Sequence, residues 1–218
     1  MPPQKDPGPE VSAAEDFGVS SGARVATLVD GVFAIVMTLL VLVIDPPRVP
    51  REELDETLVR EVLRLWPRIA AFGVSFIVLG IYWMGHHTQF RFLRRVDLGL
   101  LWVNLLFLMA VCLVPFTTHL VGHYGSEGIG LWLYGCNFIL ISLLLLAHWR
   151  YAAWRGLLRE EADGDLVPLA TRQILVGPAL YLAAIAVSFL DPRLSLLVIL
   201  AVPVLHVLPG PFHLHWTR

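Results

Sequence analysis

Hydrophobic residues along this chain gather into six stretches of helix length, each separated from the next by a polar or charged segment. An apolar stretch of about 20 residues is long enough to cross the hydrocarbon core of a bilayer as an α-helix. We therefore predict membrane-spanning helices at residues 24–44, 67–87, 97–120, 129–149, 172–190 and 194–209. The chain is thus predicted to be an all-α integral membrane protein with six transmembrane helices.

The segments between the stretches indicate where the chain leaves the bilayer. The first stretch is closed by Asp45-Pro46-Pro47, which cannot continue a helix because proline lacks the amide N–H. Residues 48–68 place acids early, arginines late and leucines at helical spacing, which is typical of an amphipathic helix at the membrane interface. We divide the chain into a disordered, proline-rich tail at 1–20, a membrane domain at 21–210 and a short tail at 211–218.

Composition supports a membrane protein and narrows the chemistry. The chain is 56% hydrophobic and 16% charged, with a mean hydropathy of +0.68 and a formal net charge of −2. It has no basic stripe with interleaved aromatic residues, so a nucleic-acid partner is not expected. It has no phosphate-binding loop, no H-E-x-x-H and no C-x-x-C, so we predict neither an enzyme nor a cofactor. Cys112 and Cys136 are interpreted as small buried hydrophobic residues.

Arginine placement predicts the orientation, because cytoplasmic loops carry an excess of positive charge. The loop between the third and fourth stretches, which lies on the side opposite the termini, has no lysine or arginine. The side of the termini would hold Lys5, Arg24, Arg91, Arg94, Arg95, Arg150, Arg155, Arg159, Arg172 and Arg218, and the opposite side Arg48, Arg51, Arg60, Arg64, Arg68 and Arg193. Both termini are therefore predicted to be cytoplasmic.

The first stretch, RVATLVDGVFAIVMTLLVLVI, carries charged residues within or beside an apolar run. A charge in lipid is costly, so it is normally kept where it faces other helices or a water-filled path. Helical spacing places on one apolar face Leu28, Ile35, Leu39 and Leu42, with Thr38 beside them. Asp30 sits well round the helix from Ile35, and we expect it to face the helix bundle. Arg24 and Asp30 could serve helix packing alone or take part in ion permeation, and the sequence leaves both roles open.

Three polar residues in neighbouring stretches are candidate partners for Asp30, namely His86, His87 and Asn104. Adjacent histidines project about 100° apart on a helix, so they do not readily bind one metal ion. We expect one histidine to donate to Asp30 and the other to lie at the membrane interface. Either side chain could titrate near neutral pH and couple gating to pH.

A second histidine pair, His119 and His123, has the i, i+4 spacing that can clamp a metal ion from one helix face. The pair lies at the end of the third stretch, no cysteine is nearby, and Glu127 is the only acid close in sequence. The sequence therefore favours an ordinary polar pair at a helix end, and no metal site is predicted.

Three segments together resemble one family. RVATLVDGVFAIVMTLLVLVI is similar to the signature first helix of the transmembrane protein 175 family, the endosomal and lysosomal potassium channels and their bacterial relatives. YWMGHHTQFRFLRRVD and LLWVNLLFLMAVCLVPFTT resemble the second and third helices of that family. The resemblance covers about residues 24–121, and the remainder agrees in hydropathy and helix count alone.

That resemblance implies a six-helix subunit of a homotetramer in a bacterial-type cell membrane, with the four first helices lining a pore for monovalent cations. It implies a channel without a P-loop, and the chain has no TVGYG-type carbonyl filter. On the family pattern Ile35 forms the narrowest constriction, Leu39 and Leu42 form further apolar rings, and Thr38 offers a hydroxyl layer. The implied function is a channel that prefers potassium weakly over sodium, with potassium as the permeant ion.

The chain departs from the family pattern beside the aspartate. The family motif reads Arg-x-x-x-Phe-Ser-Asp, whereas here Leu28 and Val29 precede Asp30. Without the serine, the polar network around the aspartate lacks one hydroxyl group. We therefore expect Asp30 to rely more on the remaining candidates, which are Arg24, His86, His87 and Asn104.

Two other functions compete with a channel. A proton-coupled or proton-leaking transporter would use Asp30 and the nearby histidines as a relay, although the chain lacks the inverted repeats and broken helices of alternating access. A non-conducting structural membrane protein would tolerate other apolar residues at position 35. Saturable, gradient-coupled flux would favour the transporter, and no flux in any gradient would favour the structural protein.

Overall fold

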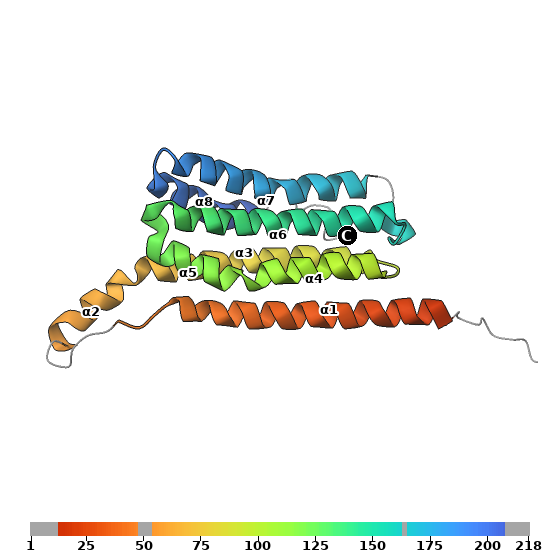
Figure 1. Cartoon of the computed structure of the whole chain (residues 1–218), viewed down its shortest axis with the longest axis horizontal. Helices are drawn as coiled ribbons and strands as arrows, with labels where there is room; N and C mark the ends of the chain where they lie inside the picture. Colours follow the sequence, from red (N-terminus) through yellow and green to blue (C-terminus); the bar gives the residue numbers. More distant parts are fainter. Residues whose placement is uncertain (1–12, 48–53, 163–164, 208–218) are drawn as a thin grey trace, which may run out of the picture.

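The computed structural model describes residues 13–47, 54–162 and 165–207 (Figure 1). Within these ranges the secondary structure is helical, apart from an isolated antiparallel bridge between Leu93 and Leu158. The α-helices are α1 (Ala13–Leu39), α2 (Leu54–Arg64), α3 (Trp66–Arg91), α4 (Leu98–Cys112), α5 (Val114–Tyr124), α6 (Ile129–Trp154), α7 (Leu166–Ser188) and α8 (Pro192–Val207). Short 3-10 helices are η1 (Leu40–Val43), η3 (Gly125–Glu127) and η4 (Glu160–Ala162).

Within the described ranges, five helical segments are long and apolar enough to cross a bilayer. They are Gly22–Val43, Thr57–Arg91, Leu98–Tyr124, Ile129–Trp154 and Leu166–Ser188. The sixth predicted stretch forms α8, whose apolar part, Pro192–Pro203, is shorter than these segments. The prediction of an all-α integral membrane protein is confirmed, with helix boundaries that differ from the predicted ones by several residues.

Helix α1 begins at Ala13, inside the stretch for which the sequence predicts disorder. No proline occurs between Pro9 and Pro46, and alanine is the strongest helix former. Residues 1–12 and the predicted tail at 211–218 lie outside the described ranges.

The third predicted span, 97–120, is divided at Leu113 into α4 and α5. Pro115 lies in the first turn of α5, where it lacks the N–H that a continuous helix would donate to the preceding turn. The amide of Leu113 bonds instead to the carbonyl of Ala110 at 3.2 Å, which closes α4 with a tight turn. Because the break occurs inside an unbroken apolar stretch, the hydropathy pattern alone cannot reveal it.

The helices pack as a bundle in which α1 lies at one edge (Figure 1). Helix α1 contacts α3, α4 and α5, whereas α6 runs through the middle and contacts α4, α5, α7 and α8. Aromatic rings fill the centre, with the Phe138 ring centroid 4.8 Å from that of Tyr134 and 5.2 Å from that of Tyr181. The position of α1 at the edge means that the subunit itself covers one of its faces only.

Helix α2 forms within the segment predicted to be amphipathic and projects away from the bundle (Figure 1). Its apolar side chains include Leu58, Val59, Val62 and Leu63, and all of these are exposed in the subunit. An apolar helix face that the subunit leaves uncovered is suited to the boundary between headgroups and acyl chains. Its location at the membrane interface therefore stays a prediction.

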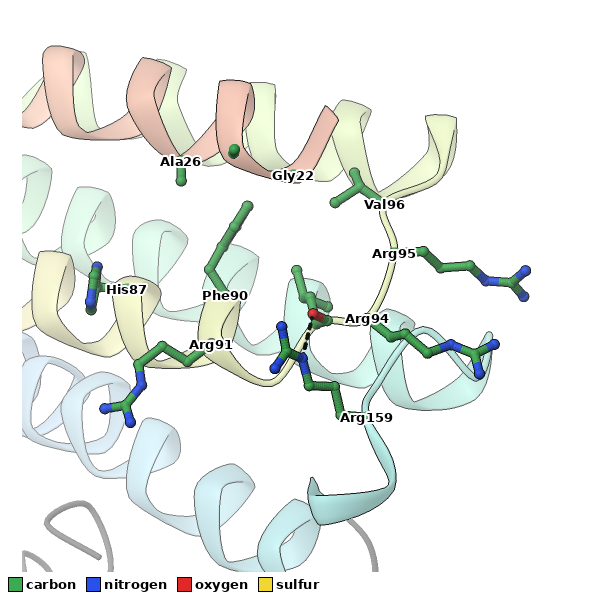
Figure 2. Close-up of a pocket in the computed structure, with 11 residues that line it drawn as sticks. Gly22, Ala26, His87, Phe90, Arg91, Arg94, Arg95, Val96 and Arg159 are labelled. Atoms are coloured by element: carbon green, nitrogen blue, oxygen red, sulfur yellow. Dashed lines mark hydrogen bonds between the residues drawn. The ribbon is translucent and has the colours of Figure 1, made fainter. Parts of the chain in front are cut away.

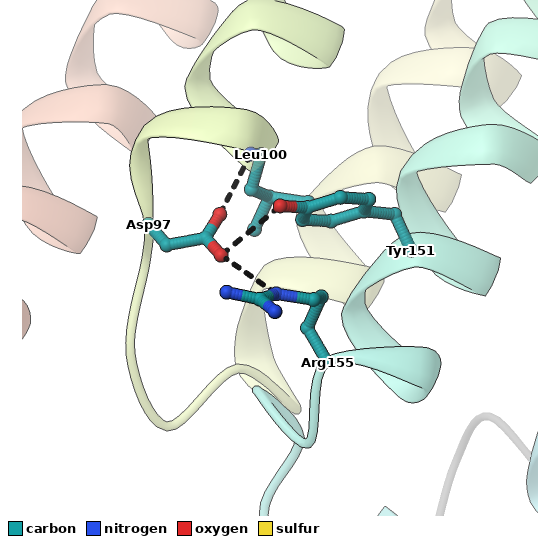
Figure 3. Close-up of polar contacts among 4 residues, drawn as sticks. All are labelled: Asp97, Leu100, Tyr151 and Arg155. Carbon is teal, nitrogen blue, oxygen red and sulfur yellow. Dashed lines mark hydrogen bonds and ion pairs between the residues drawn. The ribbon is translucent and has the colours of Figure 1, made fainter.

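A polar cluster ties the start of α4 to the end of α6 (Figure 3). The Asp97 carboxylate caps α4 by accepting from the Leu100 amide at 2.8 Å, and it also accepts from the Tyr151 hydroxyl at 3.1 Å. The Arg155 Nε donates to the same carboxylate at 3.5 Å. A Cβ at Gly99 would overlap the Tyr151 hydroxyl, so this close approach of the two helices requires glycine.

The two cysteines differ from the expectation of burial. Cys112 and Cys136 are both free thiols and both exposed on the isolated subunit. Cys112 ends α4 and Cys136 lies on the outer side of α6, and hydropathy does not distinguish the inner from the outer side of a helix that is apolar all round.

Candidate ion pathway along the first helix

Helix α1 has one face packed in the bundle and another left uncovered by the subunit. The packed face, continued into η1, is apolar and consists of Val29, Phe33, Val36, Leu40 and Val43. The Phe33 ring lies 6.0 Å from the ring of Phe107 in α4. These contacts fix how α1 is rotated about its own axis, and so they decide which residues face outward.

The uncovered face carries the residues predicted to line an ion pathway, which are Ile35, Thr38, Leu39 and Leu42, and also Leu28 of the predicted apolar face. Ile35 is 61% exposed and Leu42 is 68% exposed, the latter from η1 rather than from the α-helix itself. An apolar face of this extent must be covered by lipid or by other protein chains. The structure thus brings the five predicted residues to one side of the subunit.

The uncovered face also carries small and polar residues, which a helix that faced lipid alone would not require. Gly31 and Ala34 are exposed there, and small residues let helices approach closely in a membrane. The Thr38 Oγ1 donates to the Ile35 carbonyl at 2.7 Å. The hydroxyl proton is therefore used within the helix, and the lone pairs of Oγ1 are left to face a cation or a donor.

Asp30 has a different partner from those that the sequence suggests. The indole Nε1 of Trp83 in α3 donates to Asp30 Oδ1 at 2.8 Å. The carboxylate thus reaches a neighbouring helix, as expected, although the residue is exposed on the isolated subunit. Sequence reasoning missed Trp83 because an indole in an apolar stretch is usually a packing residue, and its single N–H donor gives no pattern.

The other predicted partners of Asp30 divide between this contact and the interior of the bundle. His86 Nε2 and Asn104 Oδ1 are 2.9 Å apart, and both side chains are buried in the bundle. The His86 ring stacks on Phe107, with ring centroids 5.1 Å apart. His87 is exposed, and its ring centroid lies 5.7 Å from that of Trp83. Among the described residues Asp30 therefore bonds to Trp83, beside which His87 lies, while His86 and Asn104 form a separate buried pair.

Arg24 is exposed near the start of the apolar span Gly22–Val43, well inside α1, and no ion pair in the described part of the chain involves it. Beside it, a pocket lies between α1 and the α3–α4 connection, lined in part by Gly22, Ala26 and the arginines Arg94 and Arg95 (Figure 2). The side chains of both arginines point away from α1 in this view. This end of the bundle therefore concentrates positive charge near the start of the apolar span Gly22–Val43.

Comparison with known proteins places the chain in a family. The family model described as the endosomal/lysosomal potassium channel TMEM175 matches residues 24–115. A potassium channel of Chamaesiphon minutus is 38% identical over 182 residues, which cover 81% of this chain and 88% of the relative. The chain belongs to the TMEM175 family.

Solved structures and distant relatives agree with membership of the TMEM175 family. The crystal structure of a lysosomal potassium-selective channel TMEM175 homologue from Chamaesiphon minutus matches with a TM-score of 0.76 and 32% identity, covering 91% of this chain and 100% of that chain. The human endosomal/lysosomal proton channel TMEM175 is 24% identical over 200 residues, or 85% of this chain and 38% of the human protein. TMEM175 proteins are ion channels, so this member is not an enzyme.

Replacing Asp30 with alanine is expected to lower the melting temperature of the purified protein, because the Trp83 N–H would lose its acceptor. A hydrogen bond to a charged group is worth about 1.5 to 3 kcal/mol, and exposure of this pair on the subunit puts the effect at the lower end. Asp30→Asn keeps an oxygen acceptor and should cost less. In the double variant Asp30→Ala/Trp83→Phe the two losses should not add, and additive losses would mean that the contact contributes nothing.

Proposed function

We propose that this chain is the subunit of a homotetrameric channel for monovalent cations, with α1 of each subunit lining the pore. The observation that carries the proposal is the uncovered face of α1, where Ile35, Thr38 and Leu39 stand outward while the opposite face is packed. A second observation is the likeness to a potassium-selective channel over the whole of that chain. Oligomerisation would cover an apolar face that a monomer leaves exposed.

Ile35 is the proposed constriction of the pore. Among the large apolar side chains described in α1 it is the most exposed, and Leu42 continues the same face in η1. Isoleucine side chains that meet on an axis exclude water, and a dewetted neck blocks ions until the helices move. Potassium sheds its hydration shell more readily than sodium, so such a neck passes potassium with a smaller penalty. A preference of this origin is modest, and it requires no cofactor.

The proposed location is a bacterial-type cell membrane, with both termini in the cytoplasm. The start of α1, the α3–α4 connection and the end of α6 lie at one end of the bundle (Figure 1). That end carries Arg91, Arg94, Arg95, Arg150 and Arg155. The excess of arginine there supports this end as the cytoplasmic one.

A proton pathway is the second candidate function, and the name of the human relative, a proton channel, favours it. Asp30 is exposed on α1 and could take up a proton. A proton relay from Asp30 through the predicted histidines is less well supported, because His86 is buried and pairs with Asn104. The channel for monovalent cations therefore stays the better supported function.

Flux from full-length protein in liposomes tests the proposal. We expect potassium-driven flux to exceed sodium flux by about tenfold or less, which corresponds to a barrier difference of up to about 1.4 kcal/mol. Potassium, sodium and proton gradients are imposed separately, and empty liposomes serve as the control. Flux in a proton gradient alone would favour the proton pathway through Asp30 over the cation channel. No flux in any gradient would indicate a structural protein.

A further inference from the structure

Three potential metal ligands meet where the first helix ends. Asp45 follows η1, and His119 and His123 lie on α5, one helical turn apart. One potential ligand atom from each side chain lies within 4.8 Å of the other two. Neither the ion pathway on α1 nor the Asp30 contact uses any of these groups.

The hydrogen bond made by His123 fixes which ring nitrogen is free. Its Nδ1 lies 3.0 Å from the carbonyl oxygen of His119, and a carbonyl accepts only, so Nδ1 carries a proton and donates. In the neutral ring the other nitrogen, Nε2, therefore has a free lone pair. A backbone carbonyl that orients a histidine in this way is the usual support of a metal-binding imidazole.

That lone pair faces a carboxylate. His123 Nε2 is 3.4 Å from Asp45 Oδ2, and two acceptors at this distance repel each other unless a cation lies between them. Ligands about 2.0 to 2.1 Å from a tetrahedral Zn²⁺ are about 3.3 Å from one another. The observed separation therefore equals that of two ligands of one metal ion. The alternative is an ion pair, in which a proton on His123 Nε2 lies between the two atoms.

His119 supplies the third ligand. Its ring stacks on that of His123 with centroids 4.0 Å apart and an interplanar angle of 29°. The two rings thus project from α5 side by side, toward the segment that carries Asp45. All three groups are only partly buried or exposed, so an ion can enter from solvent, and water can fill the fourth position.

One cation competes for the site. Arg68, near the start of α3, has its Nη1 4.0 Å from Asp45 Oδ2, the oxygen that also faces His123. A guanidinium at this distance lowers the affinity of the carboxylate for a second cation, although its side chain remains 28% exposed and partly screened. The proposed site therefore predicts that replacing Arg68 with a neutral residue strengthens metal binding.

We propose that Asp45, His119 and His123 form a binding site for a divalent transition metal of the Zn²⁺ class, which clips the segment after the first helix onto α5. Two imidazoles and one carboxylate are ligands that suit Zn²⁺. Bound metal would join the segment after η1 to α5, which η1 already contacts, and so hold the end of the first helix in place. The site is separate from the uncovered face of α1.

Calorimetric titration of the purified full-length protein with ZnCl₂ near pH 7.4 tests the site. The protein carries no polyhistidine tag, and His213 and His215 are replaced by asparagine so that they cannot contribute. We expect one Zn²⁺ per subunit, and affinity reduced by about tenfold or more in His123→Ala and in Asp45→Asn. Glu127→Gln, the acid nearest to the pair in sequence, is the matched control and should bind as the parent does.

Two further readouts separate a metal from a shared proton. Co²⁺ should give the intense visible absorption of a tetrahedral centre in the parent and not in His119→Ala, and Arg68→Gln should bind Zn²⁺ several-fold more tightly. Size-exclusion profiles check that each variant still assembles. Unchanged affinity in His123→Ala, or no saturable binding by the parent, would rule out the metal site. The contact between Asp45 and His123 would then be an ion pair alone. The titration requires no ion flux, so its result is independent of the proposed channel function.

Discussion

Substituting Ile35 with asparagine is expected to weaken the preference for potassium over sodium and to raise resting flux. An amide in the proposed neck admits water, and a wetted neck no longer requires an ion to shed its hydration shell. A tenfold rise in sodium flux corresponds to about 1.4 kcal/mol removed from the barrier, and we expect a change of this order. The measurement is the ratio of potassium to sodium flux in liposomes that contain equal amounts of protein.

The matched control for this substitution is Ile35→Val. Valine is also apolar and branched at Cβ, so the neck should stay dry and the flux ratio should stay near that of the parent. Size-exclusion chromatography of both variants checks assembly. Equal flux ratios in the asparagine variant and the parent would place the constriction elsewhere on α1, with Leu39 and Leu42 as the next residues to test.

Gly130→Ala is expected to cause a large loss of stability in this chain. Gly130 lies in the first turn of α6, where a Cβ would stand 2.8 Å from the carbonyl oxygen of Leu120 and 3.2 Å from that of Tyr124. Both atoms belong to the backbone of α5, so no side chain can rotate away and the two helices must separate. Overpacking of this kind typically costs about 1 to 3 kcal/mol, and the rigid neighbours place this case at the upper end. The measurement is the thermal unfolding midpoint in detergent.

Gly80→Ala is the matched control for Gly130→Ala. Gly80 lies within α3, and a Cβ there meets no atom within 4 Å. Alanine in a helix interior is favoured over glycine by about 1 kcal/mol, so this variant should melt at the same temperature or slightly higher. A similar loss in both variants would mean that the contact of α6 with Leu120 does not decide the stability.

The sequence by itself determined the membrane class, the helical segments and the uncovered face of the first helix. Each follows from a local property. A bilayer requires apolar stretches of a fixed length with internally satisfied backbones, and helical periodicity assigns Ile35, Leu39 and Leu42 to one side. The amphipathic α2 followed in the same way from residues 48–68. The break at Leu113 did not, because proline near the middle of an apolar stretch leaves hydropathy unchanged.

Only the tertiary structure decided which polar groups meet. Asp30 bonds to Trp83 rather than to a histidine, His86 pairs with Asn104, and Asp45, after η1, meets His123 on the neighbouring α5. Helical periodicity gives the direction of a side chain about its own helix, but not the depth and rotation of the neighbouring helix. Those are set by the packing of apolar surfaces such as Phe33 on Phe107, which brings together groups that are far apart in the chain.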